Sequence, residues 1–202
     1  MDSFRRWTDS DTFPEAGRIC HLDGEVWVDM TQEQVFTHVR VKGEFTQVLG
    51  GLAKSEQGGM YFPNGLRLSN LAADISVVPD GTYVSGESIR LGRVHFVEGA
   101  EEGYVELEGS PDMVLEVVSK SSLEKDTVIL LDAYWQSGMA EYWLVDVRKQ
   151  PLRFDIYRHT AKGYSTTRKQ RGWVRSGVFG KSFRLTQSVD PGGHPRHTLS
   201  VR

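Results

Sequence analysis

The first third of the chain has the apolar pattern of a short β-hairpin followed by a helix. Residues 19–30, ICHLDGEVWVDM, place apolar stretches on both sides of Asp23-Gly24, a pair that often closes a hairpin. From Thr31 to residue 52, apolar side chains recur at intervals of three and four, as on one face of a helix. We expect this helix to end near the glycines at 50–51, with the QGG segment at 57–59 as its exit.

A β-rich region comes next. Four segments rich in strand-forming residues lie between residues 61 and 119, separated by PNG, PDG, SGES and EGSP turns. Two of their apolar runs, DISVV and DMVLEVV, are continuous rather than alternating. Such runs are typical of central strands that are covered on both faces.

A second helix and a further strand complete the predicted core. The spacing of Ser121 and Glu124 is that of a capping box, and Gly138 offers the stop of the helix. EYWLVDV follows as a buried strand, so residues 111–147 fit a right-handed crossover between parallel strands. LRFDIYRHTAKGYSTTRKQRGWVR then has the pattern of a C-terminal hairpin.

Length and composition favour one globular domain over residues 1–202. The 39% apolar and 25% charged residues are typical of a soluble domain, and we expect residues 1–12 and 189–202 to be loose ends. No apolar stretch reaches the ~20 residues of a membrane span, and the N-terminus lacks a signal-peptide core, so we expect a cytoplasmic protein. Cys20 is the single cysteine, which excludes an internal disulfide and a thiolate zinc site built from this chain alone.

Charge is distributed unevenly along the chain. Residues 151–202 hold 11 Lys and Arg against 2 Asp and Glu, a net of +9, although the whole chain carries −3. The segment RKQRGWVR could neutralise the phosphates of DNA, with Arg171 and Trp173 as substrate-binding residues and the indole stacking on a base. A solvated surface, or a face for self-association, is the alternative.

Two carboxylates interrupt runs that otherwise read as buried strands: Asp74 in LAADISVVP and Glu116 in SPDMVLEVVS. Burial of a carboxylate is costly unless a metal, a cation or hydrogen-bond donors compensate it, so a shared divalent ion would explain both. Asp112 lies on the same strand face as Glu116 but about 13 Å away, too far to share the ion. In the alternative, Glu116 pairs with a buried Lys or Arg and Asp74 caps a turn.

Several segments closely resemble the Uma-type branch of the PD-(D/E)XK restriction-endonuclease-like superfamily. They are SPDMVLEVVSKSS, the KD pair and YWQSG of the following helix, and EYWLVDV. GRICHLDGEVWVDM and LAADISVVPD are similar to the early hairpin and first acidic strand of that branch. The resemblance covers about residues 13–160.

The resemblance implies both a fold and a reaction. The fold is α/β: a restriction-endonuclease-like mixed β-sheet core with an N-terminal helix and a crossover helix, plus N-terminal and C-terminal β-hairpins. The reaction is hydrolysis of DNA phosphodiester bonds with Mg²⁺ or Mn²⁺. The resemblance carries the first acidic residue onto Asp74 and the Glu of the E-x-K element onto Glu116, and Val117 would lend its main-chain carbonyl to the metal.

The chain departs from the family pattern at the lysine. Val118 stands where E-x-K requires Lys, and Leu130 stands where this branch commonly moves it. Lys120 and Lys125 are the two substitutes, and we favour Lys125 as the catalytic one because the first turn of the helix can point back toward the strand ends. Ordinary solvated lysines are the alternative. His38, one turn before Lys42, is a candidate substrate contact or base, or else a satisfied helix histidine.

Three functional hypotheses remain open at this point. The first is a metal-dependent endonuclease whose basic C-terminal hairpin helps to seat DNA, and pairing into a homodimer is left open. The second is a catalytically impaired, nuclease-fold protein that binds DNA or regulates, suggested by the missing lysine. The third is a metal-independent interaction domain whose basic last quarter binds the acidic body of another copy.

Overall fold

The computed structural model describes residues 1–55, 58–100 and 102–202. Its helical segments are α1 (Asp2–Thr8), the π-helix η1 (Val35–Val39), α2 (Arg40–Ser55), α3 (Gly86–Arg90), the π-helix η2 (Lys125–Ile129) and α4 (Leu130–Gln136). None of the described helices has the length and apolar content needed to cross a bilayer.

The described strands form three sheets. The first has the order β2 (Glu25–Asp29), β1 (Arg18–Leu22), β5 (Ile75–Val77), β4 (Arg67–Asn70), β8 (Tyr104–Gly109), β7 (Val94–Glu98). The second, central sheet has the order β12 (Gly163–Thr166), β11 (Arg153–Thr160), β10 (Glu141–Asp146), β9 (Met113–Val117), β6 (Gly81–Val84), β3 (Met60–Pro63). The third has the order β13 (Val174–Arg175), β14 (Ser182–Val189), β15 (Pro195–Val201).

The predicted crossover is confirmed at the centre of the molecule. Strands β9 and β10 are parallel, with Glu141 paired to Met113 and Val145 to Val117, and η2 and α4 connect them. Strand β6 runs antiparallel on the other side of β9. Strand β9 therefore lies inside the sheet with both edges paired, as its continuous apolar run predicts.

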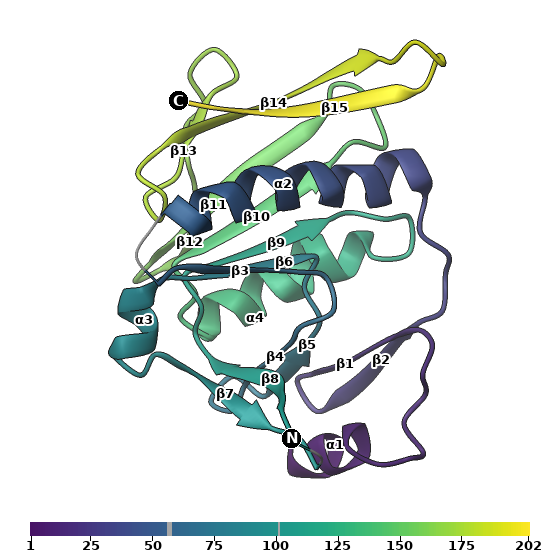
Figure 1. Cartoon of the computed structure of the whole chain (residues 1–202), viewed down its shortest axis with the longest axis vertical. Helices are drawn as coiled ribbons and strands as arrows, with labels where there is room; N and C mark the ends of the chain where they lie inside the picture. The colour runs from purple at the N-terminus through teal and green to yellow at the C-terminus, as the bar shows by residue number, and fades with distance from the viewer. Residues whose placement is uncertain (56–57, 101) are drawn as a thin grey trace.

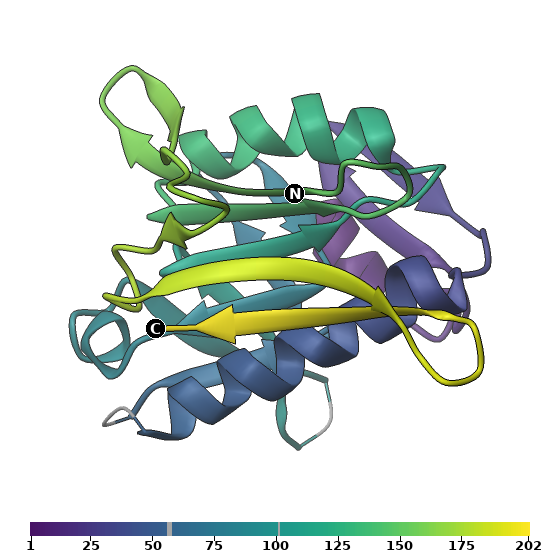
Figure 2. The same cartoon turned by 90° about the horizontal axis from the view of Figure 1, so that it is seen from above.

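Both faces of the central sheet are covered, and β9 contributes to each (Figures 1 and 2). Met113, Leu115 and Val117 belong to the apolar core shared with α2 and the β13–β15 sheet. Val114 and Val118 belong to the core shared with α4 and the first sheet. Glu116 is two residues from each of Val114 and Val118, so strand alternation directs its side chain toward the same α4 face.

The N-terminal hairpin also forms as predicted. Strands β1 and β2 pair over their full length, and the turn residues Asp23 and Gly24 have φ angles of 49° and 79°. The following helix runs to Ser55, so the glycines at 50–51 lie inside it rather than at its end, because the apolar face continues through Leu52 and Ala53. The expected exit at 57–59 lies partly outside the described residues.

The chain ends are ordered, in contrast to the expectation of loose termini. Residues 2–8 form α1, whose Phe4 is buried. Strand β15 pairs with β14 from Pro195 to Val201, and its Leu199 enters the core. The glycines and prolines of this segment lie at 190–195, where they form the connection between two long strands. They do not make the rest of the segment irregular.

Candidate metal centre and active site

Glu116 is a buried carboxylate on the central strand β9. Its side chain is within the core, with the residue 3% exposed, and the Tyr134 hydroxyl of α4 donates a hydrogen bond of 2.6 Å to its Oε1. Burial raises the pKa of Glu116 to about 8, because the ionised form has lost its water, although the charge of Lys125 opposes this effect. Near neutral pH, the carboxyl therefore readily holds a proton unless a cation approaches.

Asp80 brings a second buried carboxylate to the same strand. It immediately precedes β6, and its Oδ2 accepts a 2.8 Å hydrogen bond from the main-chain N–H of Val117, one residue beyond Glu116. Burial opposes ionisation, but contacts with His38, Lys42 and Arg18 hold the pKa of Asp80 below its usual value. Asp80 is therefore an ionised buried acid beside a protonatable one.

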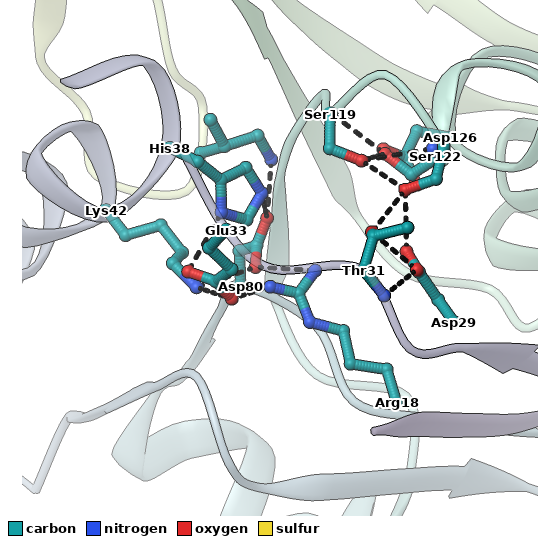
Figure 3. A network of polar contacts seen from close by, with 12 residues as sticks. Arg18, Asp29, Thr31, Glu33, His38, Lys42, Asp80, Ser119, Ser122 and Asp126 are labelled. Atoms are coloured by element: carbon teal, nitrogen blue, oxygen red, sulfur yellow. Dashed lines mark hydrogen bonds and ion pairs between the residues drawn. The ribbon is translucent and has the colours of Figure 1, made fainter. Parts of the chain in front are cut away.

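The first π-helix adds a histidine to this position, and the segment just before it adds an acid (Figure 3). His38, on η1, lies with Nε2 3.4 Å from Asp80 Oδ2 and Nδ1 3.1 Å from Glu33 Oε2. One ligand atom from each of Glu33, His38 and Asp80 lies within 4.8 Å of the others. Lys42 Nζ is 2.7 Å from Glu33 and 3.5 Å from Asp80, and Arg18 also pairs with Glu33.

The donor atoms of this group fit a small divalent cation. Asp80 Oδ1 and both ring nitrogens of His38 are buried, and within the described residues their contacts are the ion pairs above rather than hydrogen bonds. Buried polar atoms without hydrogen bonds are costly, and carboxylate oxygen with imidazole nitrogen is a ligand set that Mg²⁺ or Mn²⁺ can use. We refer to Glu33, His38 and Asp80, together with Glu116 on the neighbouring strand β9, as the metal centre, a candidate site in which Glu116 lies outside the group of three ligand atoms.

The second π-helix places a lysine beside Glu116. Lys125 opens η2, its side chain is 16% exposed, and its Nζ is 3.4 Å from Oδ1 of the buried Asp126. Although burial favours the neutral amine, the carboxylates of Glu116 and Asp126 raise the pKa of Lys125 above its usual value. Both π-helices of the described chain thus carry residues of this cluster, which agrees with the frequent occurrence of π-turns at functional sites.

A hydrogen-bonded serine loop fixes the start of η2 (Figure 3). Ser122 donates to the Asp126 carboxylate and receives a 2.9 Å hydrogen bond from Ser119. Ser121 donates to Asp29 at the end of β2, with a bond of 2.8 Å. The loop between β9 and η2 is therefore attached to the N-terminal hairpin, and this attachment orients the first turn that carries Lys125.

A cleft of about 670 Å³ lies next to the metal centre. His38, Ser119, Lys120 and Arg148 line it, and no Asp or Glu is among the lining residues described. Lys120 is exposed, and Arg148 donates to the Ser119 carbonyl at 2.9 Å while it pairs with Asp146. A cleft with basic and hydroxyl walls beside a metal centre can accommodate an anionic substrate.

Asp74 is not part of this cluster, which corrects the prediction that it shares a metal with Glu116. It lies in the turn before β5, with φ of 50° and a side chain that is 44% exposed. Its carboxylate accepts from Gly24 N at 3.0 Å and contacts His21 Nε2 at 3.0 Å, on the first sheet rather than the central one. Asp74 thus fastens the hairpin turn, as the turn alternative proposed.

The other predicted residues fall into two groups. His38, Lys120, Lys125 and Val117 lie at the metal centre or its cleft, and their roles stay predictions. Arg171 and Trp173 lie elsewhere, on the turn before β13. The ring of Trp173 already contacts the guanidinium groups of Arg184 and Arg202, which argues against the free stacking face that was expected.

Sequence reasoning assigned no role at the site to four residues of the cluster: Arg18, Glu33, Lys42 and Asp80. One signal for Asp80 was available, because Pro79-Asp80 is a Pro-Asp pair followed directly by the strand-like GTYV. Turn chemistry instead predicts a turn for this PDG segment.

Comparisons with known proteins agree with this fold. Residues 1–187 match the model of the Uma2 family, described as "Putative restriction endonuclease". A solved structure from Anabaena variabilis ATCC 29413, described as a "putative nuclease belonging to DUF820", is 20% identical, with a TM-score of 0.60 over 83% of this chain and 87% of the other. No curated protein gave a match. The α/β fold with a restriction-endonuclease-like core is thereby confirmed.

Proposed function

Because the chain belongs to the Uma2 family, we propose that it is an endonuclease that hydrolyses DNA phosphodiester bonds with Mg²⁺ or Mn²⁺ held by Asp80 and Glu116. The observation that carries the proposal is the hydrogen bond from Val117 N to Asp80, which puts this acid next to the strand position of Glu116, while His38, in contact with Asp80, lines the basic cleft. His38 is the nitrogen donor of the site, and the Val117 carbonyl remains a candidate ligand.

The ion would supply positive charge at the phosphate and make a water molecule more acidic. The residues of the chain perform the other tasks. Lys125, beside Glu116, is in the position to stabilise negative charge that develops on the phosphate during the reaction. Lys120 and Arg148 would bind neighbouring phosphate groups along the cleft. Lys125 thus replaces the lysine that is missing at Val118.

The test is nicking of supercoiled plasmid in Mg²⁺ and in Mn²⁺ by the wild type, Asp80→Asn and Glu116→Gln. We expect each variant to lose on the order of 10²-fold or more in rate, as when a transition-state contact is removed. Asp74→Asn is the matched control, because it removes an acid of the same type from an exposed turn on another sheet. It should cleave like the wild type.

Two results would contradict the proposal. Nicking by Asp80→Asn at the wild-type rate would show that the metal centre takes no part in the reaction. Loss of nicking in Asp74→Asn alone would show that the active site lies at the first sheet. A wild type that binds DNA without nicking it in either metal would favour the second hypothesis, a nuclease fold that binds DNA without cleavage. The observation behind that hypothesis is Val118, which stands where the E-x-K element has a lysine.

A further inference from the structure

Three arginines surround Trp173 in a pocket of about 520 Å³ on the third sheet, lined by Gln170, Arg171, Trp173, Arg184 and Arg202. We call it the arginine pocket. Its lining contains no Asp or Glu among the residues described.

The backbone fixes the positions of these side chains. Gln170 and Trp173 exchange main-chain hydrogen bonds of 2.8 and 3.0 Å, so Arg171 stands at the tip of a tight turn with φ of 52°. On β14, Phe183 and Leu185 point into the core, and Arg184 between them therefore points outward. The pocket is built on a hairpin turn and a paired strand rather than on loose loops.

Trp173 holds two of the guanidinium groups together. The Cζ atoms of Arg184 and Arg202 lie 4.7 and 4.3 Å from the centroid of its ring. Arginine at this distance from an indole is attracted by the ring quadrupole. The indole thus pre-orders two cations that would otherwise repel each other, which lowers the ordering cost of binding an anion between them.

None of the three arginines has an acidic partner. Within the described chain, Arg171, Arg184 and Arg202 take part in no ion pair, and Nε of Arg184 is buried without a hydrogen-bond acceptor. In the same last quarter, by contrast, Arg153 and Lys169 both pair with Asp155. Charged donors that are collected, oriented and left unpaired are complementary to an anion.

The arginine pocket is far from the metal centre. His194, in the β14–β15 turn, stacks on Phe36 of η1 at the metal-centre end of the hairpin, with ring centroids 4.5 Å apart. Arg202 follows the other end of β15, so at about 3.3 Å per residue the two ends are about 25 Å apart. Figures 1 and 2 show this hairpin along the length of α2. One phosphate group cannot contact both sites.

We propose that the arginine pocket is a second phosphate-binding site, which takes a backbone phosphate of a nucleic acid at the opposite end of the β14–β15 hairpin from the metal centre, about 25 Å along the strand. The proposal rests on the proposed function for the identity of the polyanion. At about 3.4 Å of rise per base pair, the separation corresponds to roughly seven base pairs. The net charge of +9 over residues 151–202 favours a polyanion over a small anion.

The test measures binding, not cleavage, so that it is decided even if the chain does not hydrolyse DNA. Asp80→Asn protein would be titrated with a labelled 30-base-pair duplex in EDTA at several salt concentrations, with and without Arg184→Ala and Arg202→Ala. Each phosphate contact contributes about 0.9 to the slope of log affinity against log salt. We therefore expect the double substitution, which removes one phosphate contact, to reduce the slope by about 0.9, with on the order of tenfold loss of affinity.

Two controls separate a site from a loss of charge or of fold. Arg90→Ala with Lys162→Ala removes the same charge from exposed positions outside the pocket and should leave most of the slope. Arg184→Lys with Arg202→Lys keeps the charge and should restore most of the slope, which would show that the alanine variant is not merely misfolded. Equal losses in the Arg90 and Arg184 pairs, or an unchanged slope in the Arg184 pair, would overturn the proposal.

A final arm distinguishes the source of the phosphate. The wild type would be titrated with inorganic phosphate in a calorimeter. Weak binding of free phosphate, together with the changed DNA slope, supports a backbone site. Tight binding of free phosphate that the alanine pair abolishes, with unaltered DNA binding, would assign the pocket to a small anion and overturn the proposal.

Discussion

Replacement of Glu116 by Gln should change how the stability of the metal-free protein depends on pH. In the folded chain, burial raises the pKa of Glu116 from 4.5 to about 8. A group whose pKa is raised by folding binds its proton more tightly in the folded state, so stability falls as pH rises between the two values. The contribution is complete below pH 4.5 and is lost once the pH has passed about 8.

The size of the effect follows from the same two values. One pH unit corresponds to about 1.4 kcal/mol for a single proton, so the wild type loses on the order of 5 kcal/mol across this interval relative to a chain without the group. Gln has nearly the shape of protonated Glu, and its carbonyl oxygen can accept from the Tyr134 hydroxyl that now donates to Oε1. The variant should therefore lack this decline.

Urea unfolding in EDTA, followed at pH values from 5 to 9, measures the difference. The free energy of unfolding of Glu116→Gln should rise relative to that of the wild type by several kcal/mol between pH 5 and 8.5. Glu124→Gln, an exposed neighbour of Lys125, controls for the change in net charge. A difference between wild type and Glu116→Gln that stays within 1 kcal/mol over the whole range would refute the argument that burial governs this carboxyl.

Three further predictions concern residues around and outside the metal centre. Tyr134→Phe removes the hydroxyl that donates to Glu116 and should lower the free energy of unfolding by about 1–3 kcal/mol in urea, with the larger loss at pH 9, where Glu116 is ionised. Lys125→Met should reduce nicking while Mn²⁺ still raises the melting temperature, and unchanged nicking would eliminate the lysine from the reaction. Glu141→Gln disturbs a buried carboxylate that accepts hydrogen bonds from Trp143 Nε1 at 2.9 Å and Gly177 N at 2.6 Å. Thermal unfolding should show a loss of about 2–4 kcal/mol in the free energy of unfolding. The DNA affinity, measured below the unfolding transition, should stay constant.

Local sequence patterns were sufficient for the parts of the fold that depend on neighbouring residues. The Asp23-Gly24 turn, the two-faced strand β9 and the crossover to β10 all follow from short-range periodicity and turn chemistry. Strand alternation also accounts for the position of Glu116 on the face of β9 that carries Val114 and Val118.

The choice between Asp74 and Asp80 could not be made in that way. Both acids flank the same apolar run, and the local pattern favours Asp74 as a strand residue and Asp80 as a turn residue. The outcome depends on pairing between β6 and β9, which are about thirty residues apart and place Asp80 at the N–H of Val117. Such long-range pairing is a property of the whole sheet. The π-helices that turn His38 and Lys125 toward the cluster are likewise invisible in residue spacing.

The proposed metal centre would couple metal binding to protonation. Strand β9 is covered on both faces, so a carboxylate on it is desolvated. Because of this burial, the pKa of Glu116 is raised when no ion is bound. Asp80 is stabilised in its ionised form by His38, Lys42 and Arg18. Under the proposed function, a divalent ion held by Asp80 and Glu116 would displace a proton from Glu116 but none from Asp80. Below about pH 8, its affinity should increase up to tenfold for each pH unit, as expected when binding releases one proton, and Glu116→Gln should lose this dependence along with most of the affinity.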